Sequence, residues 1–394
     1  MKVAFWFSIF VVFFTYVGYG LLLYALISVR RWIYGRRPIP QLVDYSLPTL
    51  SLIVAAYNEE QIIEDKIRNT LNLVYPQDKL KIIFVTNGST DRTPDLVRAY
   101  DMIQLLHSSE RKGKITAVHQ AMKSVDTDLV VFTDANTFLN SNALKLIARH
   151  YHDAKVGAVS GEKRVSIEEQ SDATAGEGFY WKYESTLKKW DSELYSVVGA
   201  AGELFSVRRS LYEPVPADTI LDDFMISMQI AQKGYRIVYE PDAYAVELSS
   251  ENVGEELKRK VRIAAGGIQS IVRLTALLNP FAYPVLSFQY IGHRVLRWTI
   301  TPFMLFVALV TNAVLVVWHA GWLYDILLLG QLTFYGMALG GWLLERRKIK
   351  IKVLFIPYYF CIMNYAVLAG IIRYLSGKQS AAWEKSIRKS AVAS

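Results

Sequence analysis

The chain has 394 residues, of which 52% are hydrophobic, 13% aromatic and only 20% charged, and its net charge is +8. This composition is too apolar for one ordinary soluble domain and indicates membrane segments; the basic residues form no single stripe with interleaved aromatics, which argues against nucleic-acid binding. The single cysteine, Cys361, excludes an internal disulfide and a CxxC metal site.

The first predicted element is a membrane helix within residues 1–30, because residues 4–29 are nearly all apolar and uncharged. At about 1.5 Å per residue such a helix crosses a hydrocarbon core of about 30 Å. The run is longer than the core of a signal peptide and lacks a small-residue cleavage site, which favours a retained anchor. Arginines at the start of the linker 31–48 place the following segment in the cytoplasm by the positive-inside rule.

From residue 50 the sequence alternates strand and helix signals, within a predicted domain 49–273. The expected strands are 50–56, 80–85, 103–106, 129–133, 156–159 and 236–240, and the expected helices are 60–73, 93–100, 115–123, 142–151, 174–194 and 220–233. This alternation predicts a parallel sheet with helices on both faces.

The C-terminal third returns to apolar segments. Residues 274–298 are half apolar, are broken by prolines and carry His293, Arg294 and Arg297, a pattern typical of a helix lying in the membrane interface. About three membrane helices are expected within 299–375: an uncharged turn separates the first two, and a basic run that should be cytoplasmic precedes the third. A third full crossing would place the basic tail 376–394 outside, against the same rule, so the side of the tail stays open.

An acid and an amide, Asp134 and Asn136, directly follow the apolar strand 129–133. Ligands of open α/β sheets bind just beyond the carboxyl ends of such strands. A carboxylate and a carbonyl oxygen suit a hard divalent cation, which in turn can hold a diphosphate. The alternative is a strand that ends in an Asp/Asn turn.

Three further polar stretches follow strands or lie between elements. Residues 55–60 end a buried strand in a polar turn, which could bind the base and ribose of a nucleotide. The alternative is that Glu59 and Glu60 only stabilise the first turn of the following helix. Residues 86–91 could form a polar wall of a nucleotide-binding site, or a turn that caps the following helix. Residues 111–114 form a cationic loop that would meet a diphosphate or stay solvated.

Two adjacent acids, Asp222 and Asp223, open the helix 220–233. Their like charges repel, and a helix N-terminus offsets only about 0.3–1 kcal/mol of that repulsion. Capping needs one acid, so the pair favours a general base for an acceptor hydroxyl, worth about 10²–10⁴ in rate.

Together with Gly199–Gly202 and the arginines that follow it, these motifs occur in one order that resembles the family 2 inverting glycosyltransferases with a GT-A fold. The membrane layout resembles the synthase branch, which includes cellulose, hyaluronan, chitin-oligosaccharide and poly-N-acetylglucosamine synthases. The resemblance runs from about residue 50 to 298. It implies an α/β, Rossmann-like, mostly parallel GT-A domain in the cytoplasm, held by N- and C-terminal transmembrane helices.

The resemblance also implies roles for individual residues. The nucleotide-sugar site would contain Ala55, Tyr57, Glu59, Asn87, Asp91, Lys114 and Asp134. Mg²⁺ or Mn²⁺ would be held by Asp134 and Asn136. Asp223 matches the family's general base, and Asp222 matches the acid before it. The acceptor would lie against Gly199, Gly202, Arg259 and Arg262.

Three positions depart from the family pattern. Asn87 replaces an aspartate usual in the uridine pocket, and Asn136 replaces the second aspartate of the metal triplet, so both remove charge. Processive synthases carry Gln-x-x-Arg-Trp before the interface helix, whereas this chain has Ile263 in place of the Trp that stacks on the acceptor sugar. Arg262 is kept and can pair with phosphate.

The sequence therefore predicts a multi-pass enzyme of the cell membrane with a cytoplasmic catalytic domain. It would transfer glucose or N-acetylglucosamine from a UDP-sugar to a polysaccharide or other glycan acceptor, with inversion and without nucleic-acid partners. One alternative is the transfer of a single sugar to a lipid or polyprenyl acceptor, which Ile263 favours. The other is a non-catalytic membrane scaffold, which Asn87 and Asn136 permit and which the retained Asp134 and Asp223 argue against.

Overall fold

The structure is a computed structural model that describes residues 1–37, 47–165, 174–247, 253–347 and 351–377. Contacts within the chain divide it into two units. Of the described residues, the helical unit contains those within 1–29, 174–187 and 253–377, and the sheet unit contains those within 30–37, 47–165 and 188–247. Contacts thus group the helix that precedes residue 273 with the other helices rather than with the sheet.

The sheet unit is built on an eight-stranded mixed sheet with the order β3-β2-β1-β4-β7-β6-β8-β5. The strands are β1 (Leu50–Ala56), β2 (Leu80–Asn87), β3 (Gln104–Ser108), β4 (Leu129–Asp134), β5 (Thr137–Leu139), β6 (Val156–Val165), β7 (Leu204–Arg208) and β8 (Arg236–Glu247). Strand β1 is buried along its whole length. A strand covered on both faces is typically a nearly continuous apolar run, and this one is apolar except for Ser51, whose hydroxyl hydrogen-bonds to that of Thr127.

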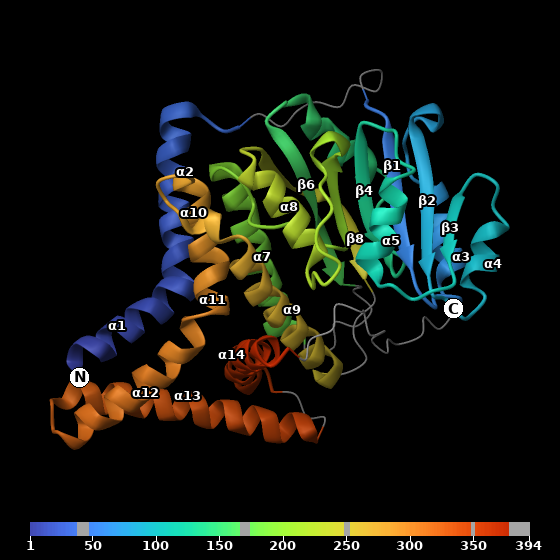
Figure 1. The fold of residues 1–394 in the computed structure, drawn as a ribbon. Helices are drawn as coiled ribbons and strands as arrows, with labels where there is room; N and C mark the ends of the chain where they lie inside the picture. The colour runs from blue at the N-terminus through green and yellow to red at the C-terminus, as the bar shows by residue number, and fades with distance from the viewer. Residues whose placement is uncertain (38–46, 166–173, 248–252, 348–350, 378–394) are drawn as a thin grey trace. The chain divides into compact units, whose positions relative to one another are not determined.

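Helices cover both faces of this sheet (Figure 1). They are α3 (Ile63–Leu71), α4 (Thr93–Arg98), α5 (Lys114–Met122), α6 (Ala143–Ala148) and α8 (Asp222–Gln232), with 3₁₀ turns at Gln77–Lys79, Arg149–His152 and Arg209–Leu211. On one face, the apolar side chains of α3, α4 and α6 pack with alternate residues of β1 and β4 into one core. On the other face, α5 packs against β1 and β2, and α8 packs against β6 and β8.

The predicted α/β fold is confirmed, and its strands and helices lie where the pattern placed them. The sheet is less parallel than expected, because β7 runs antiparallel to both β4 and β6. Neither β7 nor the short edge strand β5 was predicted from the sequence. The expected helix 142–151 is an α-helix that tightens into a 3₁₀ turn at Arg149.

The strand register brings several polar segments to one edge of the sheet. Ala55 pairs with Val85 of β2 on one side and with Asp134 of β4 on the other. Strand β7 pairs Leu204 with Thr133, so the chain just before β7 also reaches this edge. Carboxyl ends of parallel strands form the common ligand-binding edge of an α/β sheet.

The helical unit contains most of the apolar segments. Its helices are α1 (Lys2–Phe13), α2 (Tyr19–Tyr34, which continues into the sheet unit), α7 (Thr174–Leu194, likewise), α9 (Val253–Arg273), α10 (Pro284–Tyr290), α11 (Leu296–Trp298), α12 (Thr301–Val317), α13 (Trp322–Arg346) and α14 (Lys352–Leu375). A π turn at Phe14–Gly18 joins α1 to α2, a 3₁₀ turn at Thr275–Leu278 precedes α10, and a π turn at Ile291–Val295 joins α10 to α11.

Three helices of the described chain are long and apolar enough to cross a membrane: Lys2–Tyr34, Trp322–Arg346 and Val353–Leu375. The pair Pro284–Trp298 and Thr301–Val317 bends by 61° and makes a fourth if the two count as one broken span. The chain therefore has the apolar helices of a membrane protein at both ends.

Glu184 lies at the centre of a buried charge cluster in the helical unit. Its carboxylate accepts hydrogen bonds from His293 at 3.1 Å and Arg297 at 2.9 Å, and pairs with Arg294 at 2.7 Å. Burial opposes ionisation, but these cations hold the pKa of Glu184 well below its usual range. The basic residues that suggest an interfacial helix in the sequence are thus turned toward a buried acid.

Candidate functional site

A small, open pocket lies beside the ends of β1 and β2. Its lining residues include Ala55, Tyr57, Asn87, Arg111 and Lys114. The guanidinium of Arg111 lies 4.3 Å from the centre of the Tyr57 ring. An aromatic ring, a cation and an amide at the edge of a mostly apolar slot suit a planar, polar base.

The loop before α5 is held against this pocket by contacts with the end of β2. The backbone N–H of Lys112 donates to the Asn87 side-chain carbonyl at 2.6 Å. Gly88 has φ +72°, and a Cβ at that position would lie 2.7 Å from the Cα of Arg111. Only glycine combines that backbone conformation with such a close approach, so Gly88 lets the loop close over the pocket.

Lys114 is the first residue of α5, where Gly113 precedes it with φ +86°. Its ammonium group donates to Oδ1 of Asp134 at 2.6 Å, and both side chains are mostly buried. Burial works against the charged lysine, but Asp134, Asp222 and Asp223 together raise the pKa of Lys114, which stays protonated. Lys114 is therefore a permanent cation at this edge of the sheet.

A second, smaller hollow extends from Lys114 toward the start of α8. Lys114, Asp222 and Thr133 contribute its polar lining, and the other lining residues are apolar. Lys114 lines both hollows. The two hollows therefore adjoin at Lys114, and Asp134 and Asp223 are not among the residues that line either of them.

Asp223 lies in the first turn of α8. Burial and the neighbouring charge of Asp222 raise the pKa of Asp223 to about 7, against the opposing effect of Lys114. A Cβ on Gly202 would lie 2.9 Å from Oδ2 of Asp223, so this glycine makes room for the carboxylate. Gly199, with φ +81°, leaves space for the ring of Phe224 behind it. A carboxylate with a pKa near neutrality is suited to accept a proton.

The residues at the end of β4 fit a hard cation that takes most of its ligands from elsewhere. Asp134 offers a carboxylate, and Asn136 offers an amide but is only 4% exposed. Within the described residues, no group of three or more His, Cys, Asp or Glu side chains is placed to hold a metal. Mg²⁺ is commonly held by one or two carboxylates together with phosphate oxygens and water. The carboxylate of Asp134 and the amide oxygen of Asn136 are compatible with such a site.

Two charged residues behind the cleft are not singled out by the sequence pattern. Lys66 of α3 is fully buried and donates to the Thr137 carbonyl at 2.5 Å, which braces the turn that carries Asp134. Burial lowers the pKa of Lys66 to about 7. Glu203 accepts from Lys163 at 2.8 Å, and its charge raises the pKa of both Asp134 and Asp223. Lys66 and Glu203 are each distant in sequence from the residues that they contact, so only the fold brings these residues together.

The other predicted site residues have different surroundings. Asp91 accepts from the backbone N–H groups of Glu60 and Thr93, and the N–H of Glu59 donates to the Thr93 hydroxyl. These bonds join the loops after β1 and β2, and neither Asp91 nor Glu59 is among the residues that line the two hollows. Arg259 and Arg262 lie on α9 in the helical unit, and their role toward an acceptor stays a prediction.

Comparison with known proteins places this site in context. Residues 51–215 match the family model described as Glycosyl transferase family 2. The chain is 29% identical over 271 residues to the poly-beta-1,6-N-acetyl-D-glucosamine synthase of Staphylococcus aureus (strain COL), a match that covers 66% of this chain and 65% of that protein. It is 27% identical over 246 residues to the probable glycosyltransferase YdaM of Bacillus subtilis (strain 168), with 58% of each chain covered.

The comparison of structures extends over more of the chain. The mannosyltransferase PcManGT from Pyrobaculum calidifontis, solved in complex with GDP-Man and Mn²⁺, superposes with a TM-score of 0.70 at 25% identity. That alignment covers 94% of this chain and 99% of the mannosyltransferase. The match to the curated synthase, in contrast, spans less than two thirds of the synthase's own length.

Proposed function

We propose that this chain is a membrane-bound, inverting glycosyltransferase that uses a nucleoside diphosphate sugar, and the match of residues 51–215 to the Glycosyl transferase family 2 model supports this proposal. The observation that carries the proposal is the position of Lys114. It pairs with Asp134 and lines both hollows, so one cation faces the nucleotide pocket and the acids of α8.

The donor would bind along the carboxyl edge of the sheet. Its base would lie in the pocket of Tyr57, Asn87 and Arg111, and its diphosphate would face Lys114 at the N-terminus of α5. Backbone N–H groups at a helix start, with a lysine beside them, favour phosphate. A divalent cation held by Asp134 and Asn136 would neutralise charge that develops on the departing diphosphate.

Asp223 would act as the general base. Its raised pKa gives a carboxylate that accepts a proton near neutral pH, as deprotonation of a sugar hydroxyl requires. Attack by that hydroxyl at the anomeric carbon, in line with the departing diphosphate, inverts the configuration. Gly202 leaves the space in which Asp223 and the acceptor hydroxyl would meet.

For the donor and acceptor, we infer a UDP-sugar of the glucose or N-acetylglucosamine type and a glycan acceptor. The similarity to the poly-beta-1,6-N-acetyl-D-glucosamine synthase supports this assignment. The apolar helices support a place in the cell membrane, and the arginines after the first helix support a cytoplasmic catalytic domain.

A second candidate is the transfer of a single mannose from GDP-mannose to a lipid-linked acceptor. It is favoured by the likeness to PcManGT, which extends over nearly the whole chain. It is also favoured by Ile263, where processive synthases carry a tryptophan that stacks on the growing polymer.

One experiment tests the function and separates these candidates. The full chain, purified in detergent, is incubated with labelled UDP-glucose, UDP-N-acetylglucosamine or GDP-mannose, each with Mg²⁺ or Mn²⁺, together with polyprenyl phosphate or oligosaccharide acceptors. A UDP-sugar that gives a labelled glycan supports the first candidate, and GDP-mannose that gives a single-sugar lipid supports the second. Metal-dependent release of nucleotide from any donor rejects the scaffold alternative. No release and no transfer with any combination would contradict the proposed enzyme.

A further inference from the structure

The ion pair between Lys114 and Asp134 occupies the carboxylate that a metal would need. The ammonium of Lys114 lies 2.6 Å from Oδ1 of Asp134, the separation of a direct charge-assisted hydrogen bond. A divalent cation ligates carboxylate oxygens at about 2.0–2.6 Å. A metal on Asp134 would therefore stand within a few ångströms of a second positive charge, unless Lys114 turns away.

The charges around Asp134 strengthen the competition between Lys114 and a divalent cation for its carboxylate. Asn136 is neutral where a second carboxylate is usual, so Asp134 and Lys114 together leave the end of β4 with no net charge. A cation that arrives at Asp134 alone therefore meets a carboxylate that is already paired, while Asp222, Asp223 and Glu203 supply further negative charge nearby.

Lys114 also lies at the N-terminus of a helix, where a positive charge needs a nearby anion to be stabilised. It is the first residue of α5, a nine-residue helix whose N-terminus carries a partial positive charge. At that position Asp134 compensates the lysine in the absence of ligand, and a diphosphate at the same helix start would do so equally well. The lysine thus has two alternative partners within reach.

We propose that Lys114 holds the cation position of Asp134 until a donor diphosphate draws the lysine away, so that metal and donor bind cooperatively and neither binds well alone. This inference rests on the proposed function, because it takes the donor to be a nucleoside diphosphate sugar. It goes beyond that function in assigning Lys114 a second role, that of a displaceable internal counter-ion. Such coupling keeps the metal site closed until substrate is present.

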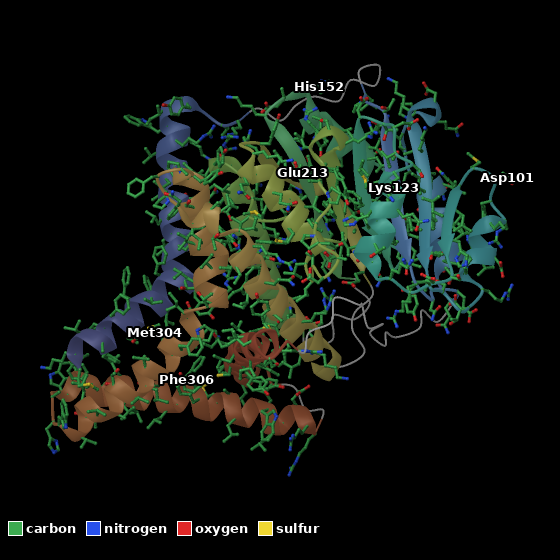
Figure 2. All side chains as sticks on the ribbon, viewed as in Figure 1. Asp101, Lys123, His152, Glu213, Met304 and Phe306 are labelled. Atoms are coloured by element: carbon green, nitrogen blue, oxygen red, sulfur yellow. The ribbon has the colours of Figure 1, made fainter. Side chains whose placement is uncertain are left out.

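The first test measures Mn²⁺ binding without nucleotide. The full chain in detergent is titrated with Mn²⁺, and the free ion is followed by electron paramagnetic resonance. Lys114→Met keeps the length of the side chain and removes its charge, so it should bind Mn²⁺ about 5-fold or more tightly than the wild type, the lower end of common coupling factors. Lys123→Met removes a lysine at the other end of the same helix, labelled in Figure 2, and should bind like the wild type.

The second test measures the reciprocal effect and does not depend on the lysine variant folding. UDP and GDP are titrated into the wild type and Asp134→Asn with EDTA present. Asparagine is isosteric and releases Lys114, so Asp134→Asn should bind the nucleotide about 5-fold or more tightly than the wild type in the absence of metal. A protein in which Asp134 only holds metal would show no gain.

The outcomes separate the inference from the function on which it rests. Equal Mn²⁺ affinity for wild type and a folded Lys114→Met, or no gain in metal-free nucleotide binding for Asp134→Asn, overturns the displaceable counter-ion even if the enzyme is active. Failure of the wild type to bind UDP or GDP under any condition, with or without Mn²⁺, overturns the proposed function as well.

Discussion

At the scale of single residues, the proposed chemistry depends on how the surroundings of Asp223 set its proton affinity. Burial and Asp222 raise its pKa, Glu203 adds to the effect, and Lys114 opposes it. A carboxylate in a less crowded position would be a weaker base at neutral pH. The crowding of acids at the start of α8 is therefore the feature that suits Asp223 to accept a proton from a hydroxyl.

This proton affinity predicts the pH dependence of the reaction. The base must be ionised to act, so kcat/KM should rise with pH through about 7, the pKa of Asp223 in the free protein. Transfer assays from pH 5.5 to 8.5 at saturating metal check this. A rate that is flat through this range, or that falls as the pH rises, would remove Asp223 as the ionising base.

The same shift makes a prediction for stability. Because the folded-state pKa of Asp223 is raised to about 7, the folded state binds the proton more tightly than the unfolded chain. Its stabilising effect is therefore lost as the pH rises from about 4 toward 7, at about 1.4 kcal/mol per pKa unit. Asp223→Asn should raise the melting temperature more at pH 8 than at pH 5. Equal increases in melting temperature at pH 5 and pH 8 would show that ionisation of Asp223 does not destabilise the folded protein.

At the scale of elements, the strand ends could be predicted from the sequence and the pairing of the sheet could not. Strands β1 and β4 are mostly apolar runs, and polar residues follow β1 and end β4, so both their bounds and the shared polar edge follow from the pattern. Strand β7 pairs antiparallel with β4 and β6, partners that lie far away in the chain. Its residues 204–208 carry no local signal that separates a strand from a loop.

In the candidate site, too, some residues could be predicted from the sequence and others could not. Asp134, Lys114 and Asp222 could be predicted because each follows or opens a recognisable element. Lys66 and Glu203 could not, since their importance comes from contacts with residues 71 and 40 positions away. The loop-bracing bonds of Asp91 show the opposite case, in which a residue of a recognised motif has the structural role of a capped turn.

The closure of the loop before α5 gives a prediction for one glycine. Gly88→Ala introduces a Cβ within 2.7 Å of the Arg111 Cα at a left-handed backbone position, so the loop must move away from Tyr57. Nucleotide affinity should fall by about tenfold or more, which corresponds to about 1.4 kcal/mol. Isothermal titration with UDP and GDP measures it.

A matched control separates strain from closure. Gly234 has φ +88° but nothing within 4 Å of a Cβ, so Gly234→Ala carries a similar backbone strain of about 1–2 kcal/mol without moving a neighbour. It should lower thermal stability and leave nucleotide affinity unchanged. Equal losses of affinity in both variants would mean that the loop is not part of the pocket.

At the scale of the whole molecule, apolar helices and an α/β sheet are two separately organised units of one chain. The sequence predicts the long apolar helices well, because an uninterrupted apolar run has few alternatives. It does not predict that Glu184 pairs with Arg294 and Arg297, which lie more than 100 positions away. From the sequence, the same cations indicate a helix exposed to the interface.

This charge cluster should dominate the stability of the helical unit. Glu184→Gln leaves two buried guanidinium groups without their carboxylate and should lower the free energy of unfolding by about 3–5 kcal/mol. Glu213, labelled in Figure 2, pairs with Lys233 at the surface, so Glu213→Gln should cost at most about 1 kcal/mol. Thermal unfolding in detergent compares the two, and similar small losses would show that the cluster is not needed for folding.

The central claim is that Lys114, Asp134 and Asp223, far apart in sequence, serve one reaction at the carboxyl edge of the sheet. The most direct test compares metal-dependent sugar transfer and nucleotide affinity in the wild type and Asp223→Asn. We expect transfer by the variant to fall by about 10²–10⁴ while its affinity for nucleotide and Mn²⁺ stays within about threefold of the wild type. Transfer by Asp223→Asn at the wild-type rate would contradict the account.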